Sequence, residues 1–314
     1  MVKILVNDGI EPIGKEMLEA AGFSVDTQKI PQEELISRLQ TYDAICVRSA
    51  TKVRKEIIDA CPNLKAIARG GVGMDNIDVE YARSRGIHVI NTPAASSRSV
   101  AELCFAHMLG LIRFLHISNR EMPVEGKTGF EVLKKKFASG TELYGKTLGI
   151  IGLGRIGREM ASMGLGLGMD VLAHDPMVTQ AEINFGPDKH RSKMIIDSTS
   201  LQDLLINSDF ISIHVPSLGK ALITMAELKE MKNDAILINA SRGGIIDEQN
   251  LLEALDKGII RGAGLDVFAG EPMPNEVLLN HPKISVSPHT GASTIEAQNN
   301  VGKELAEQLI NILK

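Results

Sequence analysis

Short apolar runs alternate with amphipathic stretches along the whole chain. In the first third, the apolar runs cover Lys3–Val6, Ala44–Val47, Ala66–Ala68 and His88–Ile90, and helix-like segments cover Glu11–Ala21, Glu33–Leu39 and Val79–Ser84. Later runs cover Thr147–Ile151, Asp170–His174, Phe210–His214, Ala235–Asn239, Gly262–Asp266 and Ile284–Ser287. Strands that alternate with helices form βαβ units, which build parallel sheets with helices on both faces. The pattern predicts an α/β protein with two doubly wound parallel-sheet domains.

Two long helical patterns indicate how the chain is divided. Ser96–Asn119 is predicted as one long apolar helix, and Ser293–Leu313 as a second, amphipathic one. Because strands precede the second set of βαβ units and a helix follows it, we predict that the first domain is discontinuous. It would contain residues 1–97 and 290–314, and the second domain residues 98–289. A small ligand is expected to bind in a cleft between such domains.

Composition and charge narrow the class of partner. The net charge of −5 argues against nucleic acid or an anionic membrane, because both need a basic face. No apolar run reaches the roughly 18 residues of a membrane helix, and the start of the chain lacks the layout of a secretion signal, so we expect a cytoplasmic protein. Cys46 and Cys104 lie in apolar runs, where we expect buried thiols, and the cysteines and histidines show no metal-ligand spacing. We therefore expect no metal site.

A glycine-rich turn carries the first functional signal. Gly152-Leu153-Gly154-Arg155-Ile156-Gly157 lies between an apolar run and a helix-like segment, and Asp175 ends the next run. In a dinucleotide-binding fingerprint, the glycines allow a tight turn, approach of the pyrophosphate and close helix packing. Asp175 would accept hydrogen bonds from the adenosine ribose and repel a 2′-phosphate. The turn therefore predicts a site for NAD rather than NADP.

Three further segments follow later apolar runs and bring Arg242, Glu271 and His289. Ligands of open parallel sheets bind beyond the carboxyl ends of the strands, so we expect these side chains to meet. A guanidinium can hold a carboxylate, an imidazole can take a hydroxyl proton, and a carboxylate can orient the imidazole. This set suits oxidation of a 2-hydroxy acid. His214 also ends an apolar run and rivals His289 on position alone, whereas His107 is expected to serve packing or the surface.

With these motifs, the chain resembles the D-2-hydroxyacid dehydrogenase family over essentially its whole length. Further family-like stretches are Val47–Thr51, Arg69–Asn76 and Gly140–Thr147. The resemblance implies a Rossmann-type NAD domain, a flavodoxin-like substrate domain, and catalytic roles for Arg242, Glu271 and His289. It implies cofactor contacts from Gly152, Gly154, Arg155, Ile156, Gly157, Asp175, Val215, Ala240, Ser241, Arg242, Asp266, His289, Gly291 and Ala292. It implies substrate contacts from Arg48, Ser49, Arg69, Val72, Gly73, Arg242 and His289.

The likeness is greatest to those family members that oxidise 3-phospho-D-glycerate to 3-phosphohydroxypyruvate in L-serine biosynthesis. It rests on Val47–Thr51 and Arg69, where a basic pocket would meet the substrate phosphate. The resemblance also implies a homodimer, and Lys134–Lys136 would either reach the neighbouring subunit's site or form a solvated face. We expect no regulatory domain after Leu313, and Pro216–Thr224 looks shorter than is usual in the family. Two alternatives remain: a reductase of hydroxypyruvate, glyoxylate or another 2-keto acid, and an NAD-binding regulatory protein.

Overall fold

The computed structural model describes residues 1–314, with the exception of the side chain of Asp188. The chain divides into two compact units. The first unit contains residues 1–97 and 292–314, and the second contains residues 98–291. The second junction lies two residues beyond the expected one at 289/290. Each unit is built on a parallel sheet, so the predicted fold class is confirmed.

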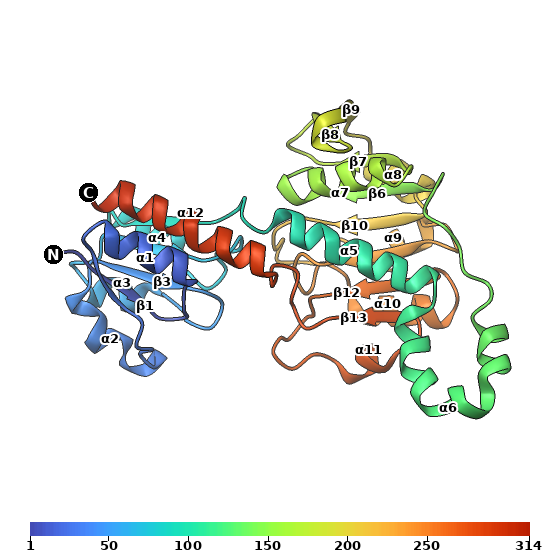
Figure 1. Ribbon diagram of the computed structural model, residues 1–314, viewed down its shortest axis with the longest axis horizontal. Helices are drawn as coiled ribbons and strands as arrows, with labels where there is room; N and C mark the ends of the chain where they lie inside the picture. Colours follow the sequence, from blue (N-terminus) through green and yellow to red (C-terminus); the bar gives the residue numbers. More distant parts are fainter. The chain divides into compact units, whose positions relative to one another are not determined.

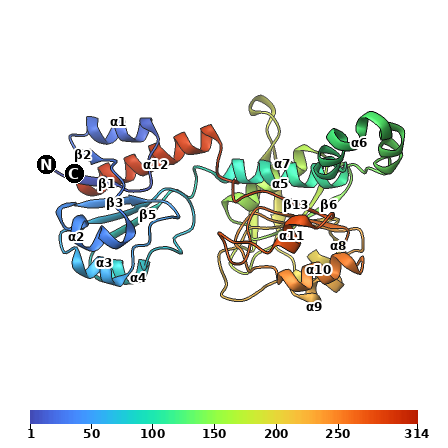
Figure 2. The ribbon, with the colours of Figure 1, turned by 90° about the horizontal axis from the view of Figure 1, so that it is seen from below.

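The first unit has a five-stranded parallel sheet in the order β2-β1-β3-β4-β5 (Figure 1). Its strands are β1 (Lys3–Val6), β2 (Ser24–Asp26), β3 (Ala44–Val47), β4 (Ala66–Arg69) and β5 (His88–Asn91). Its α-helices are α1 (Pro12–Ala20), α2 (Leu35–Arg38), α3 (Lys55–Ala60), α4 (Val79–Ser84) and α12 (Ile295–Leu313). Short 3₁₀ turns, η1 (Gln32–Glu34) and η2 (Leu39–Thr41), flank α2. Helices α1 and α12 cover one face of the sheet and α2, α3 and α4 the other (Figure 2). Every residue of β3 is buried, as expected for a central strand that is covered on both faces.

The C-terminal helix completes this unit by packing on α1. A Cβ atom added to Gly14 would lie only 2.6 Å from the carbonyl oxygen of Gly302, so the two helix backbones nearly touch. Leu305 and Leu309 of α12 share a buried core with Ile4 of β1. Close packing therefore joins the two ends of the chain in one unit.

The second unit has a six-stranded parallel sheet in the order β13-β12-β11-β10-β6-β7. Its strands are β6 (Thr147–Ile151), β7 (Asp170–His174), β10 (Phe210–Ile213), β11 (Ile236–Asn239), β12 (Gly262–Leu265) and β13 (Ile284–Val286). Its α-helices are α5 (Ser97–Ile112), α6 (Leu115–Lys136), α7 (Arg155–Gly166), α8 (Leu201–Asn207), α9 (Met225–Glu230), α10 (Glu248–Asp256) and α11 (Glu276–Asn280). The strand order reverses between β6 and β10. In open α/β sheets, ligands bind beyond the carboxyl ends of the strands at such a switch point.

Two elements of the second unit depart from the sequence prediction. After β7, the chain forms an antiparallel hairpin of β8 (Gln180–Phe185) and β9 (Ser192–Asp197), joined through the 3₁₀ turn η3 (Asp188–His190). The prediction of one helix over Ser96–Asn119 is wrong, because the helix breaks at Phe114, which has a left-handed φ of 57°. The Phe114 ring packs against Phe137, with 5.9 Å between ring centroids. This contact accompanies the change of direction of the chain at Phe114.

The composition of these two helices bears on the expectation about membranes. No single helix in the described part of the chain is long and apolar enough to cross a membrane. Helices α5 and α6 pass that test of length and composition only as a pair, and a bend of 57° separates them. Cys104 and Met108 of α5 are buried in the core of the second unit.

Candidate active site

The glycine turn after β6 has the geometry of a phosphate cradle. Gly152 has a φ of 99°, and a Cβ atom there would lie 2.4 Å from the carbonyl oxygen of His214. A Cβ atom on Gly157 would lie 2.0 Å from the carbonyl oxygen of Gly152. Gly154 differs, because a Cβ atom there would meet nothing within 4 Å. The chain itself needs two of the glycines, and the third borders open space.

Helix α7 begins directly after this open space. Gly154 is its N-cap residue, and none of the described side chains caps it. The free N–H groups of a helix N-terminus favour an anion such as a phosphate. Arg155 and Ile156 form the first residues of the helix, and Val215 follows β10 on the other side of the switch point. The turn therefore fits the pyrophosphate of a dinucleotide.

Asp175 follows β7 and joins two loops. Its Oδ2 accepts a hydrogen bond from the N–H of Leu153 at 2.8 Å, and its Oδ1 accepts from those of Met177 and Val178 at 2.8 and 3.1 Å. An ionised carboxylate offers about four acceptor positions, so capacity for a ribose hydroxyl remains. Asp175 both shapes the glycine turn and can bind the ribose.

His289 and Glu271 form a hydrogen-bonded pair beyond the carboxyl ends of β13 and β12. His289 Nδ1 lies 2.8 Å from Glu271 Oε2, while Glu271 Oε1 accepts from the N–H of Phe268 at 2.9 Å. A carboxylate on Nδ1 fixes the ring and leaves Nε2 to exchange a proton with a ligand. The His289 side chain is 50% exposed, so a ligand can reach it. This is the arrangement that the strand-end argument expected.

Arg242 lies on the neighbouring loop, after β11. Asn239 shapes this loop, because its Nδ2 donates to the carbonyl oxygen of Arg242 at 2.9 Å and its Oδ1 accepts from the N–H of Ser241 at 3.0 Å. A Cβ atom on Gly243 would lie 1.9 Å from the carbonyl oxygen of Phe268. The Arg242 loop therefore lies directly against the loop that carries Glu271.

His214 has a different environment from His289. Its Nε2 lies 2.9 Å from Ser212 Oγ, and its Nδ1 is buried with no hydrogen-bond partner among the described residues. Burial lowers the pKa of His214 to about 3. A buried ring of such low pKa is a weak base that a substrate cannot readily reach, so the geometry favours the half-exposed His289 as the acid–base residue.

Asp266 and its neighbours were only partly foreseen. Asp266 is 1% exposed, and its carboxylate accepts from the N–H groups of Thr290 and Gly291 and from Ser287 Oγ. The carboxylate is enclosed by these donors, and the cofactor contact expected from Asp266 stays a prediction. Ala240 and Ser241 lie on the Arg242 loop, and Ala292 is the first residue after the second junction.

The predicted substrate residues of the first unit follow β3 and β4. Val47 pairs in register with Arg69, so the loops after both strands share one sheet edge. Arg69 Nη2 donates to Ser49 Oγ at 3.3 Å, which brings two predicted phosphate ligands together. The Arg48 guanidinium contacts Glu11 Oε1 at 3.4 Å and the side-chain oxygen of Gln298. Arg48 thus already has anionic and polar partners within its own unit.

The loop with Val72 and Gly73 is held from β5. Asn91 Nδ2 donates to the carbonyl oxygen of Val72 at 2.6 Å, and Thr92 Oγ1 accepts from the N–H of Gly71 at 2.8 Å. Gly71 has a φ of 135°, and any Cβ there would collide with the Arg69 guanidinium. Val72 is 36% exposed, so this loop lies at the surface of its unit.

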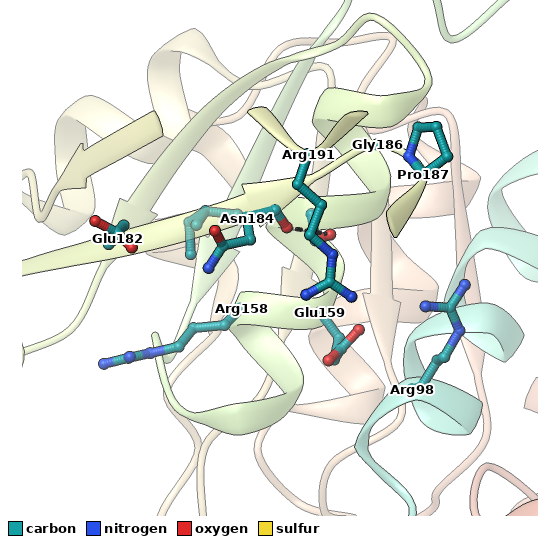
Figure 3. Close-up of a pocket in the computed structure, with 10 residues that line it drawn as sticks. Arg98, Arg158, Glu159, Glu182, Asn184, Gly186, Pro187 and Arg191 are labelled. Atoms are coloured by element: carbon teal, nitrogen blue, oxygen red, sulfur yellow. Dashed lines mark hydrogen bonds between the residues drawn. The ribbon is translucent and has the colours of Figure 1, made fainter. Parts of the chain in front are cut away.

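A polar hollow of about 540 Å³ lies elsewhere on the second unit, between α7 and the β8–β9 hairpin. Figure 3 shows the side chains of Arg158, Glu159 and Arg191 around it. Its lining includes none of the predicted catalytic or cofactor residues. In the part of the chain that the structure describes, no cluster of His, Cys, Asp or Glu is suited to a metal ion.

Known proteins are similar to this chain in both sequence and architecture. The family described as D-isomer specific 2-hydroxyacid dehydrogenase, NAD binding domain, matches residues 105–291. D-3-phosphoglycerate dehydrogenase of Methanocaldococcus jannaschii is 40% identical, over 100% of this chain and 58% of that protein. Hydroxypyruvate reductase of Thermotoga maritima is also 40% identical, over 99% of this chain and 98% of that protein.

Among solved structures, the NAD⁺-bound 3-phosphoglycerate dehydrogenase of Entamoeba histolytica is similar with a TM-score of 0.78 at 28% identity. The match covers 99% of this chain and 95% of that one. The chain spans little more than half the length of the Methanocaldococcus protein, whereas it matches the Thermotoga reductase almost end to end.

Proposed function

This chain belongs to the D-2-hydroxyacid dehydrogenase family, and from that premise we propose that it oxidises 3-phospho-D-glycerate to 3-phosphohydroxypyruvate with NAD, a step of L-serine biosynthesis. The pair of His289 and Glu271 beside the Arg242 loop carries the proposal for the chemistry. The phosphorylated substrate is supported by Arg69 on Ser49 and by the relatives named D-3-phosphoglycerate dehydrogenase.

The residues divide the work of a hydride transfer. Bound NAD supplies the acceptor for the hydride that leaves C2 of the hydroxy acid. Arg242 binds the substrate carboxylate through its planar guanidinium. His289 Nε2 takes the hydroxyl proton, and Glu271 on Nδ1 stabilises the imidazolium that forms. Arg69 and Ser49 donate hydrogen bonds to the phosphate.

We propose NAD rather than NADP because of Asp175. The carboxylate lies at the end of β7 and is tied to the glycine turn through the Leu153 N–H. A 2′-phosphate placed against it would meet like charge, and like charges at close range repel. The family's NAD-binding domain covers this part of the chain.

Reduction of hydroxypyruvate or glyoxylate is the second candidate. Arg48 contacts Glu11 and Gln298, which leaves fewer cations for a phosphate. The relative named hydroxypyruvate reductase matches the whole chain, which supports the same reading. A panel of 2-keto acids with NADH tests the proposal. Turnover of several acids, with phosphohydroxypyruvate first, is expected, and no turnover of any acid would favour the regulatory alternative.

We further propose a homodimer whose contact includes α6. This helix exposes Leu115, Met122, Val124, Phe130 and Val132. Val124 is 81% exposed, and several large apolar side chains exposed on one helix are typical of an interface. Sedimentation of wild-type protein and Val124→Lys tests this proposal. The variant should sediment with the mass of a monomer, and a variant that remains dimeric would contradict a contact through α6.

A further inference from the structure

A chain of buried polar groups leads from α5 to the catalytic turn. His107 of α5 is 5% exposed, and its Nδ1 lies 2.8 Å from Ser285 Oγ while its Nε2 lies 2.9 Å from Ser287 Oγ. Ser287 Oγ in turn donates to Asp266 Oδ1 at 2.6 Å. Four polar side chains are thus connected within the core of the second unit.

The donors and acceptors in this hydrogen-bonded series can be assigned in only one order. Ser287 has a single hydroxyl proton, and a carboxylate that accepts from two backbone N–H groups requires a donor at that position. Ser287 therefore accepts from His107 Nε2–H, and His107 Nδ1 accepts from the hydroxyl of Ser285. Burial lowers the pKa of His107, which agrees with a neutral ring that carries its proton on Nε2.

Asp266, at the other end of this hydrogen-bonded series from His107, holds the turn that carries His289. The carboxylate of Asp266 accepts hydrogen bonds from the N–H groups of Thr290 and Gly291 at 2.8 Å each. The main-chain carbonyl oxygen of Asp266 accepts a third from the N–H of His289 at 2.8 Å. His289 has a φ of 53°, a left-handed conformation that costs free energy outside glycine. Such a turn persists only where its surroundings hold it.

From these contacts we propose that His107 is a positioning residue. It keeps the hydroxyl of Ser287 turned toward Asp266, so that Asp266 holds residues 289–291 in the conformation that places the His289 ring on Glu271. The packing fixes His107 itself, because a Cβ atom on Gly264 of β12 would lie 2.7 Å from the Cβ of His107. This role rests on the proposed function for its effect on turnover, but not for its effect on the turn.

Two substitutions separate the two ring nitrogens. Gln at position 107 places an N–H close to the position of Nε2 and can still donate to Ser287, whereas Leu removes both hydrogen bonds. His107→Leu should lower kcat for 2-keto acid reduction by about tenfold with a smaller change in KM, because a displaced acid–base group slows chemistry more than binding. His107→Gln should recover most of that loss.

His116 provides the matched control. It is also a histidine that bridges elements of this unit, with Nδ1 3.2 Å from the carbonyl oxygen of Gly110 and Nε2 3.1 Å from that of Pro282. His116→Leu should leave kcat unchanged. A comparable fall in kcat for His116→Leu would show that His107 acts only through general stability, and would overturn the proposal.

Hydrogen exchange supplies a readout that needs no activity. The amides of Thr290 and Gly291 should exchange about tenfold faster in His107→Leu and in Ser287→Ala, as expected when an accepting group is loosened, and at the wild-type rate in His116→Leu. The double variant of His107→Leu and Ser287→Ala should be no worse than either single variant, since both act on one chain. Unchanged exchange in His107→Leu, or additive losses in the double variant, would overturn the proposal even if the protein proves to act on a different substrate.

Discussion

The environment of each histidine, rather than its place at a strand end, distinguishes the catalytic candidate. His214 and His289 both follow buried strands of the second unit. His289 is half-exposed and paired with Glu271, whereas His214 has one buried nitrogen without a described partner and a pKa of about 3. A group that exchanges protons with a substrate needs access and an orienting partner, and only His289 has both.

Paired substitutions test that distinction. His289→Asn should lower kcat by roughly 10²–10⁴-fold, the usual effect of losing a positioned proton-transfer group, and His214→Asn should cost far less. Steady-state kinetics with NADH and the favoured 2-keto acid provides the measurement. A larger loss in His214→Asn would mean that the wrong strand end has been chosen.

Asp175 has two tasks at the residue scale, and two substitutions separate them. Asp175→Ala should weaken NAD binding and reduce discrimination against NADP by roughly 1–3 kcal/mol, the scale for a charge-assisted hydrogen bond. Asp175→Asn retains an acceptor for the Leu153 N–H but lacks the charge, so it should reduce the discrimination with less loss of NAD affinity. Titration with both cofactors checks this, and unchanged affinity in both variants would place the ribose elsewhere.

At the scale of elements, the glycine turn shows how one short motif serves both folding and binding. Gly157 brings α7 against β6, while Gly154 borders open space. Glycine at position 157 is needed for the chain to fold, whereas glycine at position 154 leaves room for a ligand. Substitutions at these two positions should therefore have opposite consequences.

Gly157→Ala should reduce the free energy of unfolding by about 1–3 kcal/mol or more, because its Cβ would overlap the carbonyl oxygen of Gly152. Gly154→Ala should leave stability nearly unchanged, since Gly154 has an ordinary φ of −74° and no atom within reach, yet it should weaken NAD binding. Urea unfolding and cofactor titration of both variants give the comparison. A stable Gly157→Ala, or full NAD affinity in Gly154→Ala, would contradict this account of the turn.

The elements that the sequence did predict are those whose burial leaves a strong pattern. Ala44–Val47 is apolar at each position because both faces of its sheet are covered, and such runs were located correctly. The β8–β9 hairpin was missed, although Ala181 and Ile183 are buried between exposed neighbours, which is the alternation of a half-buried strand. The break at Phe114 had no local signal, because its ring contact with Phe137 forms only after folding.

The same contrast applies to the candidate site. Strand ends predicted the segments of Arg242, Glu271 and His289, because the topology of a parallel sheet carries loops to one edge. The buried hydrogen bonds that hold the His289 turn could not be predicted from the sequence in this way. His107 and Ser287 are 180 positions apart in the chain, and only packing of α5 on β12 brings them together.

At the scale of the whole molecule, burial of His214 links stability to pH. Its folded-state pKa of about 3 lies below the ordinary value near 6.5, so the unfolded chain binds a proton more readily. Stability is then present above pH 6.5 and is lost as the pH falls toward 3. Between pH 7 and 5, this one group should lower the free energy of unfolding by about 2 kcal/mol.

Comparison of wild-type protein with His214→Asn isolates this contribution, because His107 and the surface groups remain in both. Urea unfolding at pH 7 and pH 5 should show the larger decrease in wild-type protein. Equal decreases in the two proteins would indicate that His214 accepts a proton in the folded state without cost.

We propose that this D-2-hydroxyacid dehydrogenase recognises a phosphorylated three-carbon acid. The most direct measurement is the ratio of kcat/KM for phosphohydroxypyruvate to that for hydroxypyruvate, with NADH at saturation. A phosphate held by Arg69 and Ser49 should contribute about 1.5–3 kcal/mol, so the ratio should be at least about tenfold. Arg69→Ala should remove most of this preference and leave hydroxypyruvate reduction nearly unchanged. A ratio near one in wild-type protein, or equal losses on both substrates in Arg69→Ala, would contradict the claim and leave a dehydrogenase of unphosphorylated 2-hydroxy acids.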